Sequence, residues 1–258
     1  MQLMSWQSGT LIFLAYLAVA TLVRPRLARE RRMRAALCVL AGAMVLALSM
    51  ALPGEHLLNA WVLPPTLLWI GYWGTGQLFV APMPVLERGL LAIDRGLRVD
   101  DIAARLPSSV VEILELAYTA VYPLIPIALW LALQHGISAD RFWTVVLVTD
   151  YVCFGMLPWF QTRPPRSLGV QTPWRSRWRA INLRVLDAGS VQVNTFPSGH
   201  AAEAMAVFLI LASASWPVSA AMLICAVAIS AGAVFGRYHY AADAIAGWLV
   251  ALIVFSFA

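Results

Sequence analysis

Residues 196–215 read FPSGHAAEAMAVFLILASAS, a helix-start signal followed at once by an apolar run. Proline and serine are favoured where a helix begins, because proline lacks the N–H that the first turn leaves unpaired and serine caps that turn. The run over 198–215 approaches the roughly 20 apolar residues that cross a bilayer. The sequence therefore predicts a membrane helix whose first residues, Ser198-Gly199-His200, lie where the membrane meets water.

Apolar stretches of this kind occur along the whole chain. Of the 258 residues, 61% are hydrophobic and 12% are charged, and the mean hydropathy is +0.75, whereas soluble domains are about 45–50% apolar and about 25% charged. This composition excludes a soluble globular protein and predicts an all-α, polytopic membrane bundle of roughly six to eight transmembrane helices. The candidate spans are 9–23, 35–52, 57–81, 110–134, 142–160, 198–215, 218–235 and 240–258.

The candidate span 57–81 is the least regular of these. Pro64 and Pro65 interrupt it, and so do Gly71, Gly74 and Gly76. Such breaks are typical of a kinked span or of a re-entrant hairpin. The choice between the two decides the topology of everything that follows.

The connection 83–107 is predicted to be an interfacial amphipathic helix, because apolar residues recur near helical spacing opposite charged ones. The apolar face contains Leu86, Leu90, Ile93, Leu97, Ile102 and Leu106, and the charged face contains Arg88, Asp94, Arg95, Arg98 and Asp101. With no repeat or linker elsewhere, 1–258 is expected to form a single membrane domain. It would comprise N-terminal spans in 1–82, the interfacial helix, and a catalytic helical core in 108–258.

Three polar segments adjoin the later spans: 163–166 (RPPR), 196–200 (FPSGH) and 236–243 (GRYHYAAD). Because the spans between them cross in alternation, all three lie on one membrane face. His239 and Asp243 are four residues apart, so on a helix the carboxylate can accept from one imidazole nitrogen and leave the other as a nucleophile. Unpaired N–H groups at the start of span 198–215, with Arg163, Arg166 and Arg237, suit a phosphate.

A cation site is the alternative use of the same residues. His200, His239 and Asp243 could ligate a metal, but they lack an obvious fourth ligand and lie among arginines that would repel a cation. We therefore predict no metal and no other cofactor.

The polar segments resemble the three signatures of the type-2 phosphatidic acid phosphatase superfamily of membrane lipid phosphatases and phosphotransferases. Pro197-Ser198-Gly199-His200 is similar to its second motif, His239 with Asp243 to part of its third, and Arg163-Pro164 to the end of its first. The resemblance implies that His239 attacks phosphorus to form a phosphohistidine, that Asp243 holds its ring, and that His200 protonates the leaving oxygen. It assigns the phosphoryl oxygens to Arg163, Arg166, Ser198, the Gly199 N–H and Arg237.

Two positions depart from the family pattern. Met156 stands where the first motif usually has a lysine, and Ala233 stands where the third usually has an arginine. Arg166 and Arg237 are expected to supply the missing charge.

The forms Arg-Pro-Pro-Arg and Arg-Tyr-His-Tyr, with Glu115-x-x-Tyr118-x-x-x-Tyr122 upstream, look closer to the inositol phosphorylceramide synthase-like branch. A headgroup or acceptor pocket near Glu115 and Tyr118 is therefore expected. Helix packing explains the intramembrane Glu115 and Asp150 equally well at this point.

The leading interpretation is a lipid phosphate phosphatase that hydrolyses a lipid phosphomonoester or pyrophosphate through a phosphohistidine without a metal. The alternative is a phosphotransferase that moves a phospho-headgroup from a phospholipid to a lipid alcohol, and an anionic lipid transporter comes third. The expected partners are a lipid phosphate or phospholipid substrate and the membrane lipids. Nucleic acid is excluded because the arginines lie at the ends of apolar helices, and a homo-oligomer is not indicated.

The chain is expected to be a multi-pass protein of a plasma or inner membrane. If all eight stretches cross, 17 of the 18 arginines share the face of the polar segments, which the positive-inside rule makes cytoplasmic. The family resemblance implies the extracytoplasmic face instead, and a re-entrant 57–81 would reverse the count. The sequence leaves both sides open.

Overall fold

The computed structural model describes residues 3–169, 172, 174–194 and 196–258. Over these residues the chain is helical and has no strand, only an isolated bridge between Thr162 and Asn194. The all-α prediction is therefore confirmed. The helices are α1 (Ser5–Val23), α2 (Arg29–Ala51), α3 (Leu57–Trp61), α4 (Leu63–Gly76), α5 (Pro84–Gly96), α6 (Val99–Ala104), α7 (Ser108–Gln134), α8 (Ala139–Met156), the 3₁₀ helix η1 (Pro165–Leu168), α9 (Arg177–Gly189), α10 (Gly199–Leu211), α11 (Trp216–Phe235) and α12 (Ala241–Phe257).

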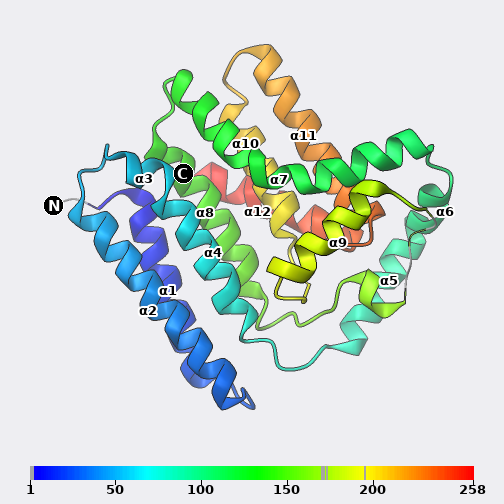
Figure 1. The fold of residues 1–258 in the computed structure, drawn as a ribbon, viewed down its shortest axis with the longest axis horizontal. Helices are drawn as coiled ribbons and strands as arrows, with labels where there is room; N and C mark the ends of the chain where they lie inside the picture. The colour runs from blue at the N-terminus through cyan, green and yellow to red at the C-terminus, as the bar shows by residue number, and fades with distance from the viewer. Residues whose placement is uncertain (1–2, 170–171, 173, 195) are drawn as a thin grey trace.

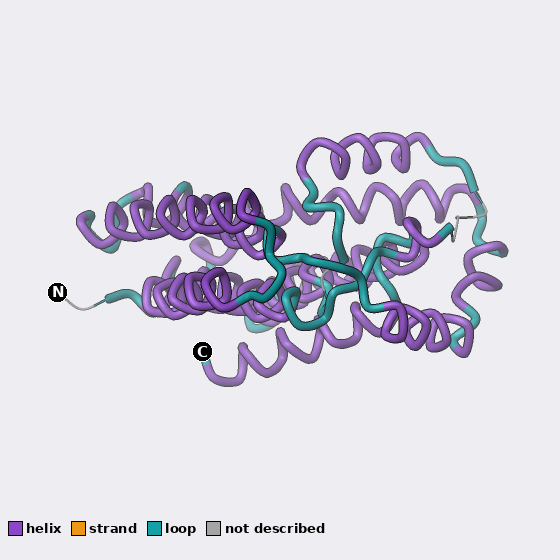
Figure 2. Tube along the Cα trace, turned by 90° about the horizontal axis from the view of Figure 1, so that it is seen from below, coloured by secondary structure: helices purple, strands orange, loops and turns teal. Residues whose placement is uncertain are grey.

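The helices pack in two groups that share α8. Helices α1, α2, α4 and α8 run side by side, and α7, α10, α11 and α12 form the second group (Figure 1). Helix α8 contacts α1 and α4 on one side and α10 and α12 on the other. Large side chains such as Trp6, Phe142 and Trp143 fill the core, and several connecting loops gather near the middle of the molecule (Figure 2).

The outward surface of the bundle is apolar. Helices α1, α2, α7 and α11 are long and apolar enough to cross a membrane, and α10 and α12 are apolar but shorter. Large hydrophobic side chains such as Ile12, Leu22, Met44, Ile224 and Ile253 are exposed on these helices. Such a surface requires lipid around it, so the chain is a helical membrane protein.

The segment 57–81 runs from one end of the bundle to the other. It forms α3 and α4, which are separated only at Val62. Near its start, the Asn59 amide donates to the Ser49 carbonyl at the end of α2, 3.2 Å away. Beyond its end, Arg31 at the start of α2 donates to the carbonyl of Phe79. The segment 57–81 therefore runs beside α2 from one end to the other, which is the path that a kinked span would take.

The predicted helix over 83–107 is broken into α5 and α6. Arg98 adopts a left-handed conformation with φ of 54° between them, which a continuous helix does not allow. The face that α5 turns inward contains Glu87, Leu90 and Asp94, whereas Ile93 is 46% exposed. The prediction that Asp94 lies on the solvated face is thus wrong, because partners on other elements hold it inside.

Candidate active site

His239 lies in the short turn between α11 and α12. Its Nδ1 is 3.4 Å from Oδ2 of Asp243, and the ring is 6% exposed. Asp243 is the third residue of α12, and the same Oδ2 accepts from the Tyr240 N–H at 3.0 Å and from the Asn194 amide at 2.9 Å. The expected pair is therefore present, but it forms where a helix begins and not along a helix face. Contact at Nδ1 leaves Nε2 as the other nitrogen of the His239 ring.

His200 lies on the first turn of α10. Helix α10 begins as expected after Ser198, whose Oγ accepts from the Ala201 N–H at 3.3 Å. The His200 ring stacks on Tyr118 with centroids 4.8 Å apart, and its centroid is 5.9 Å from that of His239. Its Nε2 is buried and makes no hydrogen bond to any residue that the structure describes.

A cavity of about 190 Å³ connects the two histidines to the interior of the bundle. Arg166, Gly199, His200 and His239 line one end of it. Among the expected site residues, Tyr118 also lines the cavity, but Ser198, Asp243, Arg163, Arg237 and Glu115 do not. The remainder of the wall comes mainly from aromatic and aliphatic residues of α4, α7, α8 and α9.

Two of the three expected phosphate-binding arginines are turned towards α5. Arg163 donates to Glu87 from Nε at 3.0 Å and from Nη2 at 2.8 Å, and these hydrogen bonds lower the pKa of Glu87. Arg237, 1% exposed, donates to Asp94 at 2.9 Å and also binds Asp100. Carboxylates thus hold Nε and Nη2 of Arg163 and both terminal nitrogens of Arg237, and neither arginine lines the cavity.

Arg166 is placed differently. Its guanidinium lies over the Tyr238 ring, 5.5 Å from the centroid, and the side chain lines the cavity. No carboxylate pairs with it within the described part of the chain. Arg166 is thus the arginine that is available to an anion in the cavity.

Helix α5 binds two of the polar segments, 163–166 and 236–243. Glu87 binds Arg163, and Asp94 binds Arg237 and also accepts from the Ala241 N–H at 2.9 Å, at the start of α12. Glu87 and Asp94 are seven residues apart, so they lie on one face of α5. Sequence reasoning missed this role because an acidic residue on an amphipathic helix resembles a solvated one. The signal that could have revealed it is helical spacing, because Glu87 and Asp94 share one face of α5 with the apolar Leu90, which is buried.

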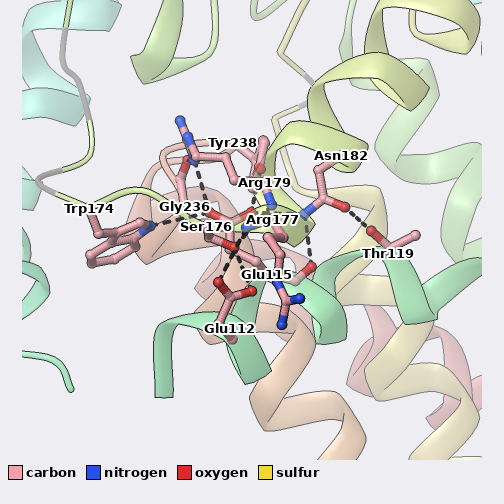
Figure 3. Close-up of polar contacts among 10 residues, drawn as sticks. All are labelled: Glu112, Glu115, Thr119, Trp174, Ser176, Arg177, Arg179, Asn182, Gly236 and Tyr238. Atoms are coloured by element: carbon pink, nitrogen blue, oxygen red, sulfur yellow. Dashed lines mark hydrogen bonds and ion pairs between the residues drawn. The ribbon is translucent and has the colours of Figure 1, made fainter. Parts of the chain in front are cut away.

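Glu115 belongs to a polar network and not to an open pocket. It is 1% exposed and accepts from Asn182 at 2.8 Å, from the Tyr238 hydroxyl at 2.6 Å and from Arg179 at 3.0 Å (Figure 3). The network ties α7 to α9 and to the residue before His239. The expectation of a headgroup pocket at Glu115 is therefore not supported, since its oxygens are occupied, whereas Tyr118 does line the cavity.

The electrostatic surroundings keep His239 uncharged. Burial, and to a smaller extent the positive charge of Arg166, lower the pKa of His239 to about 3. A neutral imidazole has a free lone pair on one nitrogen, which a nucleophile requires. Within the described residues no group of three or more His, Cys, Asp and Glu side chains is arranged to hold a metal ion.

The geometry therefore combines a buried, carboxylate-oriented histidine, a second histidine and an arginine at the end of one cavity. A family model described as the PAP2 superfamily matches residues 89–257, from α5 to the last residue of α12. No curated protein and no solved structure matches the chain.

Proposed function

The chain belongs to the PAP2 superfamily, a membership that supports a lipid enzyme of the phosphatase or phosphotransferase type, and on this premise we propose that it hydrolyses a lipid phosphomonoester or pyrophosphate without a metal. The observation that carries the proposal is the cavity end at which His239, His200 and Arg166 meet. Reacting atoms must approach to about 3–3.5 Å. The two rings are neighbours at this end, with centroids 5.9 Å apart, so both lie within reach of one phosphoryl group bound in the cavity.

In the proposed reaction Nε2 of His239 attacks phosphorus. The N–P bond forms as the ester P–O bond breaks, and His200, which is protonated when the anionic phosphate lies beside it, gives this proton to the leaving oxygen and becomes neutral. Water, deprotonated by His200, then attacks the phosphohistidine, the N–P bond breaks, and inorganic phosphate leaves. Asp243 holds the Nδ1 proton of His239 throughout, and Arg166 stabilises the phosphoryl oxygens with its fixed charge.

The helix start at Ser198 and Gly199 is proposed to add to the phosphate site. Gly199 lines the cavity beside His200, and the positive end of a helix favours an anion. Ser198 would position this helix start, since its hydroxyl caps α10 and its N–H donates to the Asp243 carbonyl at 3.0 Å. Arg163 and Arg237 are proposed to position these segments through α5.

A phosphotransferase of the inositol phosphorylceramide synthase-like kind is the second candidate. It is favoured by the apolar depth of the cavity, where Val121 and Ile125 of α7 and Trp143 of α8 could accept the tail of a lipid alcohol. In that case the alcohol replaces water in the second step.

Phosphate release in detergent micelles with a chelator present distinguishes the two candidates. The substrates are phosphatidate, an isoprenyl pyrophosphate and a phosphoinositide, each with and without added ceramide. We expect release without ceramide. Transfer that occurs only with ceramide would establish the phosphotransferase, and the absence of both reactions in folded protein would favour a transporter.

We also propose that the site faces the cytoplasm. Because 57–81 passes along the whole bundle, the connection between α1 and α2 lies at the same end as the polar segments. Four arginines bind partners in or near the site, namely Arg163, Arg166, Arg179 and Arg237. Of the other 14, all except Arg141 lie at that end of the candidate spans, which is the cytoplasmic end by the positive-inside rule.

Cysteine labelling in intact cells tests this orientation. In a background without the three native cysteines, Arg175→Cys places an exposed thiol on the site face and His135→Cys places one at the opposite end. An impermeant maleimide is expected to label His135→Cys from outside and Arg175→Cys only after lysis. The reverse pattern would place the site outside the cytoplasm.

A further inference from the structure

Two carboxyl groups in the cavity form no hydrogen bond or ion pair with any described residue. Asp150 of α8 is fully buried, and neither of its carboxylate oxygens accepts a hydrogen bond within the described part of the chain. Glu203 of α10 lines the same cavity, and no residue that the structure describes forms a hydrogen bond or ion pair with it. The two groups are close enough to interact electrostatically.

This isolation contrasts with the other buried acids. Glu87, Asp94, Glu115 and Asp243 each accept from an arginine, a backbone N–H or an amide. A buried carboxyl without a partner is costly, and intramembrane acids usually face a ligand or a polar partner. Asp150 is therefore positioned to accept hydrogen bonds from a group of the substrate.

The position of the pair along the cavity limits what that group can be. Glu203 follows His200 by three residues, a rise of about 4.5 Å along α10. On α8, Trp143 precedes Asp150 by seven residues, about 10 Å farther from the site. Oδ1 of Asp150 lies 3.4 Å from the place that a Cβ on Gly199 would take, so the pair adjoins the phosphate site on the side that leads to the apolar depth.

The surroundings favour a cation over a hydroxyl group. A hydroxyl could donate to only one oxygen of the pair, whereas an ammonium group donates up to three hydrogen bonds and its positive charge favours the ionised form of a carboxyl group beside it. Tyr72, Tyr122 and Phe154 line the cavity as well, and aromatic faces attract ammonium groups. A diacylglycerol backbone offers neither group at this place.

We propose that Asp150 and Glu203 form a subsite for an ammonium group that the lipid carries between its phosphate and its hydrocarbon chain. The substrate class is then a long-chain amino-alcohol phosphate. This inference rests on the proposed function for the place of the phosphate, but the subsite is a separate feature of the cavity.

The ratio of kcat/KM values for two lipids tests the subsite. The lipids are a long-chain 2-amino-alcohol 1-phosphate and its N-acetyl derivative, which keeps the chain and the hydroxyl groups but loses the charge. The native protein is expected to prefer the amine by about 10- to 100-fold, the range for a charge-assisted hydrogen bond. In Asp150→Asn and in Glu203→Gln the ratio is expected to fall towards one.

The matched control is Asp101→Asn, which removes a carboxylate from an exposed pair with Arg98. It is expected to keep the native ratio. An unchanged ratio in both cavity variants, or no preference for the amine in the native protein, would overturn the subsite. Thermal unfolding adds a second readout. If Asp150 binds a ligand, Asp150→Asn should not lower the Tm of the ligand-free protein. If Asp150 serves helix packing, the same variant should have a lower Tm.

Binding separates the subsite from hydrolysis. In His239→Ala, quenching of tryptophan fluorescence reports either lipid entering the cavity, since Trp69 and Trp143 line it. We expect tighter binding of the amine, and loss of this difference when Asp150→Asn is added. If the native protein releases no phosphate from any lipid, the phosphatase proposal fails, and the binding difference alone decides the subsite.

Discussion

His239→Ala is expected to reduce phosphate release by at least about 10³-fold without unfolding the protein. In the proposed reaction this ring is the nucleophile, and the ring of the neighbouring His200 is stacked on Tyr118, with its centroid 5.9 Å from that of His239. The assay is single-turnover release of phosphate from the best micellar substrate. With substrate labelled in the phosphoryl group, the native protein should retain label that acid removes, and the variant should retain none.

His135→Ala is the matched control, because His135 is an exposed histidine at the far end of α7. It should keep native activity.

Since the pKa of His239 is lowered to about 3, the His239 ring is neutral at pH 7 and stays neutral as the pH falls to about 5. An NMR titration of the imidazole signals tests this: a signal that is lost in His239→Asn and titrates near the ordinary value of about 6.5 would contradict it. Phosphate release that survives in His239→Ala would contradict the nucleophilic role.

Asp94→Ala is expected to have the largest effect on stability. It removes the carboxylate from a buried pair in which Arg237 and Asp94 are 1% and 2% exposed, and it leaves the Ala241 N–H without its acceptor. Breaking a buried pair on one side costs about 3–5 kcal/mol. The loss in the free energy of unfolding should be about 3 kcal/mol, because Asp100 still contacts Arg237. Thermal unfolding in detergent measures the loss.

Activity should fall as well, because Asp94 holds both ends of the turn that carries His239. Assayed at a temperature where the variant is folded, kcat should decrease more than KM changes. Asp101→Ala provides the control, since its pair with Arg98 is exposed and such pairs contribute about 0–1 kcal/mol. A second check is the double variant Asp94→Ala/Arg237→Ala, which should lose less stability than the two single losses together. Additive losses would mean that the pair is not coupled.

Much of the fold follows from local sequence. Apolar runs of membrane length predicted the principal helices, and Pro197-Ser198 marked the start of α10 correctly. The path of 57–81 could not be predicted, because the same prolines and glycines serve a kinked crossing and a hairpin. Only the contacts of its two ends with α2 show that the segment runs along this helix. The single-domain organisation over 1–258 stays a prediction.

The site divides in the same way. Spacing alone brings His239 to Asp243, and a helix start alone presents His200, since these relations span a few residues of backbone. The roles of the arginines were decided by partners far along the chain: Glu87 is 76 residues from Arg163, and Asp94 is 143 residues from Arg237. Identical side chains therefore differ in function. The sequence determined the helices, the histidines and their sidedness relative to one another, because these depend on composition and short spacing. The tertiary structure decided that Arg166 faces the cavity and that Asp150 and Glu203 have no partner among the described residues, because a side chain's surroundings come from elements that the sequence does not place beside it.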